Sequence, residues 1–141
     1  MSENSNPSSQ PSPDNFWQKG DPLPSALQAE IDPAKFDQYS MNPDNPRNLG
    51  KWQAFEEIGY DVKDLENRQA AAQQIIDQLR RNLPSASAIA GKPTLHGCRF
   101  EVKTFIRSPI GKMGTLVTIW QVDLDRTIPR LITNWLEVHR L

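Results

Sequence analysis

The sequence predicts an α+β domain: N-terminal helices packed on a three- to four-stranded antiparallel meander, preceded by a disordered tail. Three observations support this prediction. The first 46 residues hold eight of the twelve prolines. Apolar residues then recur every three or four positions up to residue 83, and every second position from residue 98 onward. Helices followed by consecutive strands are typical of an α+β fold whose helices cover one face of the sheet.

The N-terminal tail, residues 1–32, is predicted to be disordered or weakly ordered. It is rich in Pro, Ser, Asn and Asp, and such a segment cannot bury enough apolar surface to offset the entropy of ordering it. Phe16 and Trp17 interrupt it; they either contact the domain weakly or form a short docking motif for a partner. Ser25 is a candidate N-cap for a short helix near its end. A single domain is predicted over residues 33–141.

Two short helical segments are predicted next. A helical turn over residues 33–40 should bury Phe36 and Tyr39, the apolar residues of its inner side. Asn48 is a suitable N-cap for a helix over residues 49–58, since its short polar side chain can accept a bond from a free backbone N–H.

A long amphipathic helix is predicted from about residue 62 to residue 83. Gly59 ends the preceding helix, and Asp61 followed by Asp64 resembles a capping box for the new one. Its apolar residues form one stripe, and Pro84 ends it.

Three strands are predicted at residues 98–107, 115–124 and 130–138, because each is rich in β-branched or aromatic residues and is bounded by turn residues. In the first of them, alternate side chains should face the core: Cys98, Phe100, Val102, Thr104 and Ile106.

Composition excludes several classes of protein. The single cysteine excludes an internal disulfide and a cysteine-based zinc cluster. No stretch approaches the roughly 18 apolar residues of a membrane span. The N-terminus lacks the basic start and apolar core of a secretory signal, so we expect a soluble, cytoplasmic protein without membrane contact. Net charge is −1, with two basic residues against six carboxylates in residues 1–40 and eight against four in residues 91–141.

Several short motifs occur in a fixed order between residues 39 and 134. The sequence resembles a bacterial group, domain-of-unknown-function family 6883, whose members occur alone and at the C-termini of polymorphic-toxin-type proteins. The motifs that carry the resemblance are Asn42, Pro43 and Pro46; Gly50, Lys51, Phe55 and Gly59; Phe100 and Val102; Gly111 or Gly114; Val117, Thr118 and Trp120; and Pro129, Arg130, Leu131 and Thr133. The resemblance implies a domain boundary and no activity. Helices followed by a curved antiparallel sheet are also similar to small ribonuclease toxins of the barnase and RelE kind, by analogy of fold.

His96 and Lys51 are the candidate catalytic residues. Metal-free RNA cleavage needs a base, an acid and a cation for the phosphorane. His96 stands before the first predicted strand, near cationic residues, and is either such a base or acid or an exposed turn residue. Lys51 lies near the start of the first helix and either strengthens anion binding there or is simply solvated.

Five residues are candidates for binding an anion or a partner: Arg99, Lys103, Arg130, Thr118 and Thr133. Arg99 and Lys103 alternate along one strand face as a short cationic stripe, which is also what an ordinary solvent-facing sheet presents. If Trp120 lies near Arg130, the pair could stack a base and hold a phosphate. The alternation of apolar residues instead favours Trp120 as a core residue.

Two functions remain open. In the first, favoured by composition, the chain is a non-catalytic interaction module, such as an immunity or adaptor protein, whose sheet or acidic tail binds a protein partner. In the second, it binds or cleaves RNA on the open face of the sheet, and cleavage requires Lys51, His96 and Arg130 to meet in one cleft. No cofactor and no metal are predicted, because no carboxylate pair or His/Cys cluster has a suitable spacing.

Overall fold

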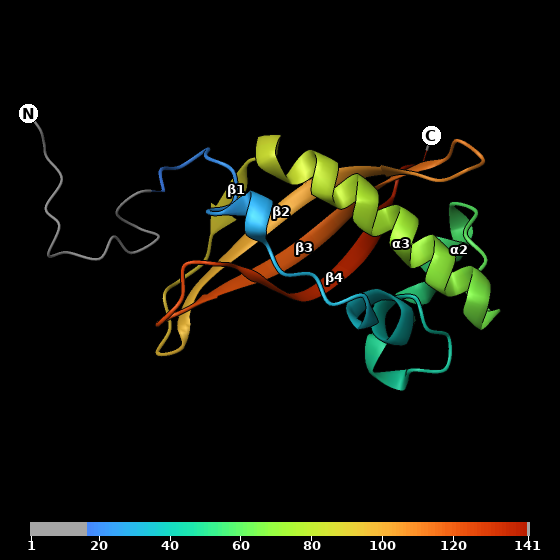
Figure 1. Ribbon diagram of the computed structural model, residues 1–141. Coiled ribbons are helices and arrows are strands. Elements are labelled where there is room, and N and C mark those ends of the chain that lie inside the picture. The colour runs from blue at the N-terminus through green and yellow to red at the C-terminus, as the bar shows by residue number, and fades with distance from the viewer. Residues whose placement is uncertain (1–16, 141) are drawn as a thin grey trace, which may run out of the picture.

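The fold is a four-stranded antiparallel sheet with one long helix lying along one face (Figure 1). The computed structural model describes residues 17–140, so the predicted disorder of residues 1–16 lies outside the described residues. The strands follow the order β1-β2-β3-β4 in space. They are β1 (Ala88–Ala90), β2 (Gly97–Arg107), β3 (Met113–Asp123) and β4 (Arg130–Val138). The predicted α+β class with an antiparallel meander is confirmed.

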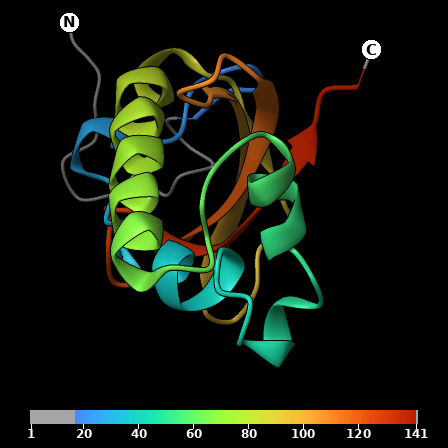
Figure 2. The same cartoon turned by 90° about the vertical axis from the view of Figure 1, so that its right-hand side faces the viewer.

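The core lies between the sheet and helix α3 (Leu65–Asn82). Seen end-on in Figure 2, α3 stands to one side of the curved sheet. The sheet contributes Phe100, Val102, Ile106, Leu116, Trp120 and Val122, and the helix contributes Ala72, Ile75, Ile76 and Leu79. Trp120 has no exposed surface and is paired with Phe100 in the β2–β3 register. The alternation in β2 and the core position of Trp120 are therefore confirmed.

The start of α3 differs from the prediction. The helix begins at Leu65, and its N-cap is Asp64, whose carboxylate accepts a hydrogen bond from the Asn67 amide at 3.0 Å. Asp61 is thus not the first half of a capping box. Val62, predicted as the first helical residue, is fully buried ahead of the helix, because an apolar residue just before a cap also packs on the core.

The chain before α3 forms only short helical segments. They are the 3₁₀ helices η1 (Ala26–Gln28) and η3 (Pro46–Asn48), the π-helical turn η2 (Lys35–Ser40) and helix α2 (Trp52–Glu57). Ser25 precedes η1 but makes no side-chain cap, since its backbone is left-handed with φ of 52°. In η2, Phe36 is buried as predicted, whereas Tyr39 is only partly buried.

The packed body extends N-terminal of the predicted boundary at residue 33. Leu23 and Ala29 are buried in the core. The Trp17 ring meets Phe100 edge-on, with ring centroids 5.3 Å apart. The Glu30 amide donates to the Pro129 carbonyl at 2.9 Å, which ties this segment to the start of β4. Few apolar residues are enough here because the sheet already provides the surface that they cover.

Two features are absent from residues 17–140. No helix within residues 17–140 is long and apolar enough to cross a membrane. Across the same range, no group of three or more His, Cys, Asp or Glu is placed to hold a metal ion.

Candidate functional site

Lys51 and Tyr39 form a polar pair beside strand β4. The Lys51 ammonium donates to the Tyr39 phenol oxygen at 3.0 Å. The same Nζ lies 4.9 Å from the centroid of the Tyr39 ring and 5.6 Å from that of the Trp135 ring. Both distances fall in the range of cation–π attraction. The half-buried Lys51 therefore has its ammonium near two aromatic rings.

A buried amide fixes the position of Tyr39. Asn134 of β4 has no exposed surface. Its Oδ1 accepts a hydrogen bond from the Ser40 hydroxyl at 2.7 Å, and its Nδ2 donates to the Lys35 carbonyl at 3.1 Å. Both ends of η2 are thus attached to one side chain of β4, which determines where Tyr39 stands.

A second buried amide shapes the loop that carries Lys51. Asn48 donates to the carbonyls of Tyr39 and Asn42, each at 2.7 Å, and accepts from the Gly50 amide at 2.9 Å. The prediction that Asn48 caps the following helix is wrong. Helix α2 begins only at Trp52, and the Asn48 side chain is already used to connect the loop to η2.

The environment of Tyr39 lowers the pKa of its phenol. The hydrogen bond from Lys51 is the main cause, burial opposes it, and the Thr133 hydroxyl and the positive charge of Lys35 add to the lowering. Thr133 belongs to β4, and its Oγ1 is buried with no partner among the described residues that meets ordinary hydrogen-bond geometry. The phenolate form of Tyr39 is thus stabilised by the groups around it.

Two hollows flank this pair. One of about 500 Å³ is lined by Lys51 and Trp135 together with Gly50, Glu57 and Arg140. The other, of about 400 Å³, is lined by Tyr39 and Thr133 with Lys35 and Gln38. Tyr39, Lys51, Thr133 and Trp135, here called the Tyr39 cluster, therefore border open space on both sides.

Lys51→Met is expected to raise the pKa of Tyr39 toward the ordinary value for tyrosine, because the ammonium that stabilises the phenolate is removed. Absorbance of the tyrosinate form during a pH titration measures this. In the wild type, the folded-state pKa lies below the unfolded one. The resulting stabilisation is fully present above the unfolded pKa and is lost as pH falls through the folded pKa. Stability near neutral pH should therefore not depend on the ionisation of Tyr39.

Lys63→Met is the matched control for that titration. Lys63 also lies over an aromatic ring, 5.9 Å from the Trp52 centroid, but it pairs with Glu56 and does not contact Tyr39. An equal shift in both variants would mean that general charge, not the Lys51 hydrogen bond, controls the phenol.

A second polar group lies on the sheet face opposite α3, here called the open face. Arg99 of β2 donates to Gln121 of β3 at 3.2 Å, and Gln121 donates to Asp123 at 2.6 Å. Arg130 of β4 forms an ion pair with Asp123 at 2.9 Å. Hydrogen bonds from Arg130 and then Gln121 lower the pKa of Asp123. Arg99 and Arg130, predicted as binding residues, are thus joined through one carboxylate.

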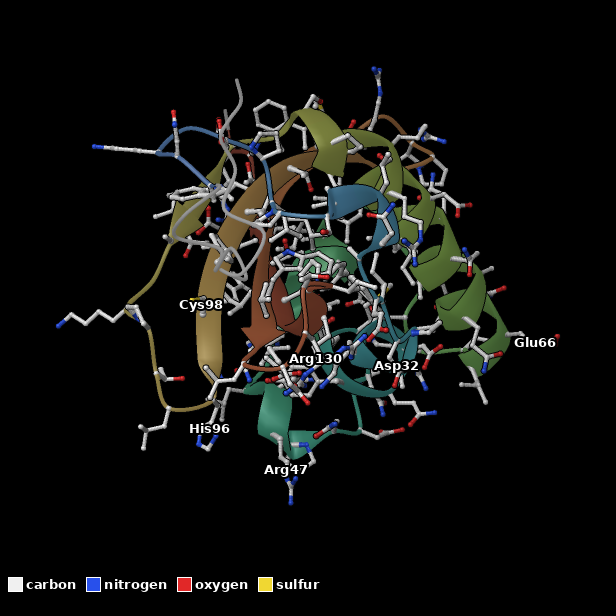
Figure 3. The ribbon with its side chains drawn as sticks, turned by 60° about the vertical axis from the view of Figure 1, so that its left-hand side comes forward. Asp32, Arg47, Glu66, His96, Cys98 and Arg130 are labelled. Carbon is white, nitrogen blue, oxygen red and sulfur yellow. The ribbon has the colours of Figure 1, made fainter. Side chains whose placement is uncertain are left out.

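The remaining candidates have other surroundings. Thr118 is fully buried; its hydroxyl donates to the Val102 carbonyl and accepts from the Trp120 indole. Figure 3 shows His96 in the loop that leads into β2, with its ring directed outward, and Arg130 nearer the centre of the view. Lys103 is exposed on the open face.

The three residues required for the RNA-cleaving hypothesis have different neighbours. Across residues 17–140, no hydrogen bond, ion pair or ring contact joins any two of Lys51, His96 and Arg130. Trp120 also does not stack beside Arg130. Arg130 is paired with Gln121 in the register and faces away from the core that holds Trp120.

Sequence reasoning identified Lys51 and Thr133 but not Tyr39 and Trp135 as their neighbours. The sequence predicts Tyr39 as a buried residue of a helical turn and assigns Trp135 no binding role. No helical or strand period relates residue 39 to residue 51. Only the Asn48-shaped loop brings them together, so the sequence held no direct signal for this contact.

One solved structure is similar to this chain in fold. One chain of a solved contact-dependent growth inhibition toxin–immunity protein complex from Klebsiella pneumoniae 342 aligns with a TM-score of 0.54 and 15% identity, covering 81% of this chain and 97% of that one. This likeness shows a shared fold. No curated protein matches in sequence. The model of the domain of unknown function DUF6883 matches residues 22–137, and the chain belongs to that family.

Proposed function

We propose that the chain is a non-catalytic interaction module that binds a carboxylate-bearing protein surface on its open face. The observation that carries this proposal is the outward row of β2. Arg99, Lys103 and Arg107 are exposed there with no ion pair among residues 17–140, and Glu101 is the single carboxylate in the row. Phe105, between two of these cations, is 63% exposed.

An exposed aromatic ring among unpaired cations fits a protein interface. Interfaces are enriched in aromatic residues and Arg, and complementary charge guides the partner into register. At the end of the same face, the His139 ring meets Phe105 edge-on with ring centroids 5.6 Å apart. Phe105 and His139 thus form a preformed aromatic contact that a partner can cover.

RNA is the alternative partner and is less well supported. Single-stranded RNA binds to series of exposed aromatic rings, whereas Trp120 is buried and Trp135 is partly covered by Lys51. The solved protein with the same fold is in a toxin–immunity complex, so the fold occurs where protein partners are bound. Toxin association and a cytoplasmic location stay predictions for this chain.

Reversing the charge of the β2 row is expected to weaken partner binding. Arg99→Glu and Lys103→Glu should each raise the dissociation constant about tenfold, since close charge pairs across interfaces commonly contribute at least this much. Proteins captured by the wild type from an RNase-treated lysate of the source cells would be identified, purified and titrated against each variant. Affinity for the true partner should fall as salt increases.

Arg81→Glu is the matched control, because Arg81 is exposed on α3, away from the open face. The proposal would be overturned if the partner binds the β2-row variants as tightly as it binds Arg81→Glu. It would also be overturned if no captured partner still binds after purification. The RNA alternative is tested by incubating labelled total RNA with the protein in the absence of metal. Cutting by the wild type but not by Lys51→Ala or His96→Ala would make the chain a ribonuclease, and capture that disappears after RNase treatment would make RNA the ligand.

A further inference from the structure

The Tyr39 cluster has a local excess of positive charge. Lys51 and Lys35 both act on Tyr39, and neither forms an ion pair with a carboxylate among residues 17–140. Glu57 lines the hollow beside Lys51, but its carboxylate is bound to Arg140 at 2.8 Å. The positive charge of Lys51 is therefore not compensated within the hollow that it borders.

Hydrogen-bond donors in the cluster are not all used. Lys51 has three N–H groups, one of which points to the Tyr39 oxygen. The phenol oxygen accepts this bond, and within the described part of the chain no acceptor takes the phenol's own proton. Thr133 adds a buried hydroxyl that has no partner of ordinary geometry there. A phenol, a hydroxyl and an ammonium thus lie together with donating capacity to spare.

The cluster is also rigidly placed. Tyr39 is held through the Ser40–Asn134 hydrogen bond, and Lys51 through the loop that Asn48 fixes. Binding sites gain affinity when donors are positioned before the ligand arrives, because less side-chain entropy is then lost. Lys51 and Trp135 border the hollow of about 500 Å³, whereas Tyr39 and Thr133 border the one of about 400 Å³ on the other side of the Lys51–Tyr39 hydrogen bond. Either hollow is ample for a phosphate group and a small attached moiety.

We propose that the Tyr39 cluster is a phosphate-binding site, in which Lys51 and Tyr39 hold the oxygens of a phosphate monoester or diester. A phosphate offers several charged acceptor oxygens, so it can take bonds from the ammonium and from the phenol at once. Trp135, whose ring lies beneath Lys51, forms one wall against which the group attached to the phosphate packs. This site lies at the β4 edge and is separate from the β2 row proposed to bind a protein.

The test uses the full-length protein and three defined probes at constant ionic strength: inorganic phosphate, adenosine monophosphate and a short RNA oligonucleotide. Each is titrated by calorimetry, and the tyrosinate absorbance of Tyr39 is followed in parallel. A bound anion next to the phenol disfavours the phenolate, so at least one probe should raise the Tyr39 pKa. Lys51→Met should raise the dissociation constant of that probe about tenfold or more, since the substitution removes a charged hydrogen-bond donor.

Lys63→Met serves as the control lysine, and Thr133→Val tests the hydroxyl without changing side-chain size. The probe with the tightest binding indicates whether the phosphate comes from a nucleotide, from RNA or from solution. The proposal is overturned if no probe changes the Tyr39 pKa, if Lys51→Met binds as tightly as the wild type with an unchanged unfolding midpoint, or if chloride alone has the same effect. RNA that binds here and stays intact supports this site, whatever the outcome for the protein partner.

Discussion

Gly97→Ala is expected to destabilise the protein by about 4 kcal/mol, the largest effect among our predictions. Gly97 begins β2 with φ of +134°, and a Cβ at this position would lie 2.0 Å from the Val122 carbonyl oxygen. That oxygen belongs to the backbone of β3 at Val122, which is paired with Cys98 of β2 and cannot retreat without breaking the ladder. The midpoint of urea unfolding, with an unchanged slope, measures the loss.

Gly20→Ala separates backbone strain from the steric contact. Gly20 also has a positive φ, +98°, but a Cβ there would meet no atom within 4 Å. It should cost only about 1 kcal/mol. If Gly97→Ala costs no more than this control, the approach of β2 to β3 is not rigid, and our account of this sheet end is wrong.

The effect of Gly97→Ala should extend to the open face of the sheet. Gly97 is paired with Asp123, which joins Arg130 and Gln121. A shift of β3 at this point would release the carboxylate that orients both Arg130 and, through Gln121, Arg99. A Gly97→Ala variant that still folds should therefore bind the proposed protein partner more weakly, although Gly97 itself presents no side chain.

The strands could be predicted because one face of the sheet is buried. Burial forces apolar residues into every second position, as Phe100, Val102 and Ile106 show, and this alternation is readable in a single sequence. Strand β1 carries only three residues, too few for a period to be recognised. The helical turns before α3 are equally short, so their ends depend on side chains such as Asn48 that bond to distant backbone.

The site could be predicted only in part, because it depends on an irregularity in β4. The register pairs Trp120 with Leu131 but Ile119 with Thr133, so one extra residue, Ile132, lies in β4 between them. Strict alternation would place Arg130 and Thr133 on opposite faces. The extra residue puts both on the open side of the sheet. No pattern in the sequence marks this bulge, and the neighbours of Thr133 could not be derived without it.

Asn134→Ala is expected to cost about 3 kcal/mol of stability. The buried amide makes the one hydrogen bond that joins Ser40 to β4 among residues 17–140, and its removal takes this partner from the Ser40 hydroxyl and the Lys35 carbonyl and leaves a cavity. Because η2 also carries Tyr39, the same change should move the Tyr39 pKa toward its ordinary value. Urea unfolding and the tyrosinate titration measure the two effects on one sample.

A double-mutant cycle with Ser40→Ala assigns the cause. Ser40 and Asn134 are directly bonded, so the two substitutions should not be additive, and the double variant should be more stable than the sum of the single losses predicts, by about 1 kcal/mol or more. Thr115→Ala provides a reference substitution at a half-buried polar position of β3, where the side chain contacts His139. Additive losses would mean that the cavity, not the hydrogen bond, dominates. In that case, Tyr39 would be positioned by packing, and its pKa should stay low in Asn134→Ala.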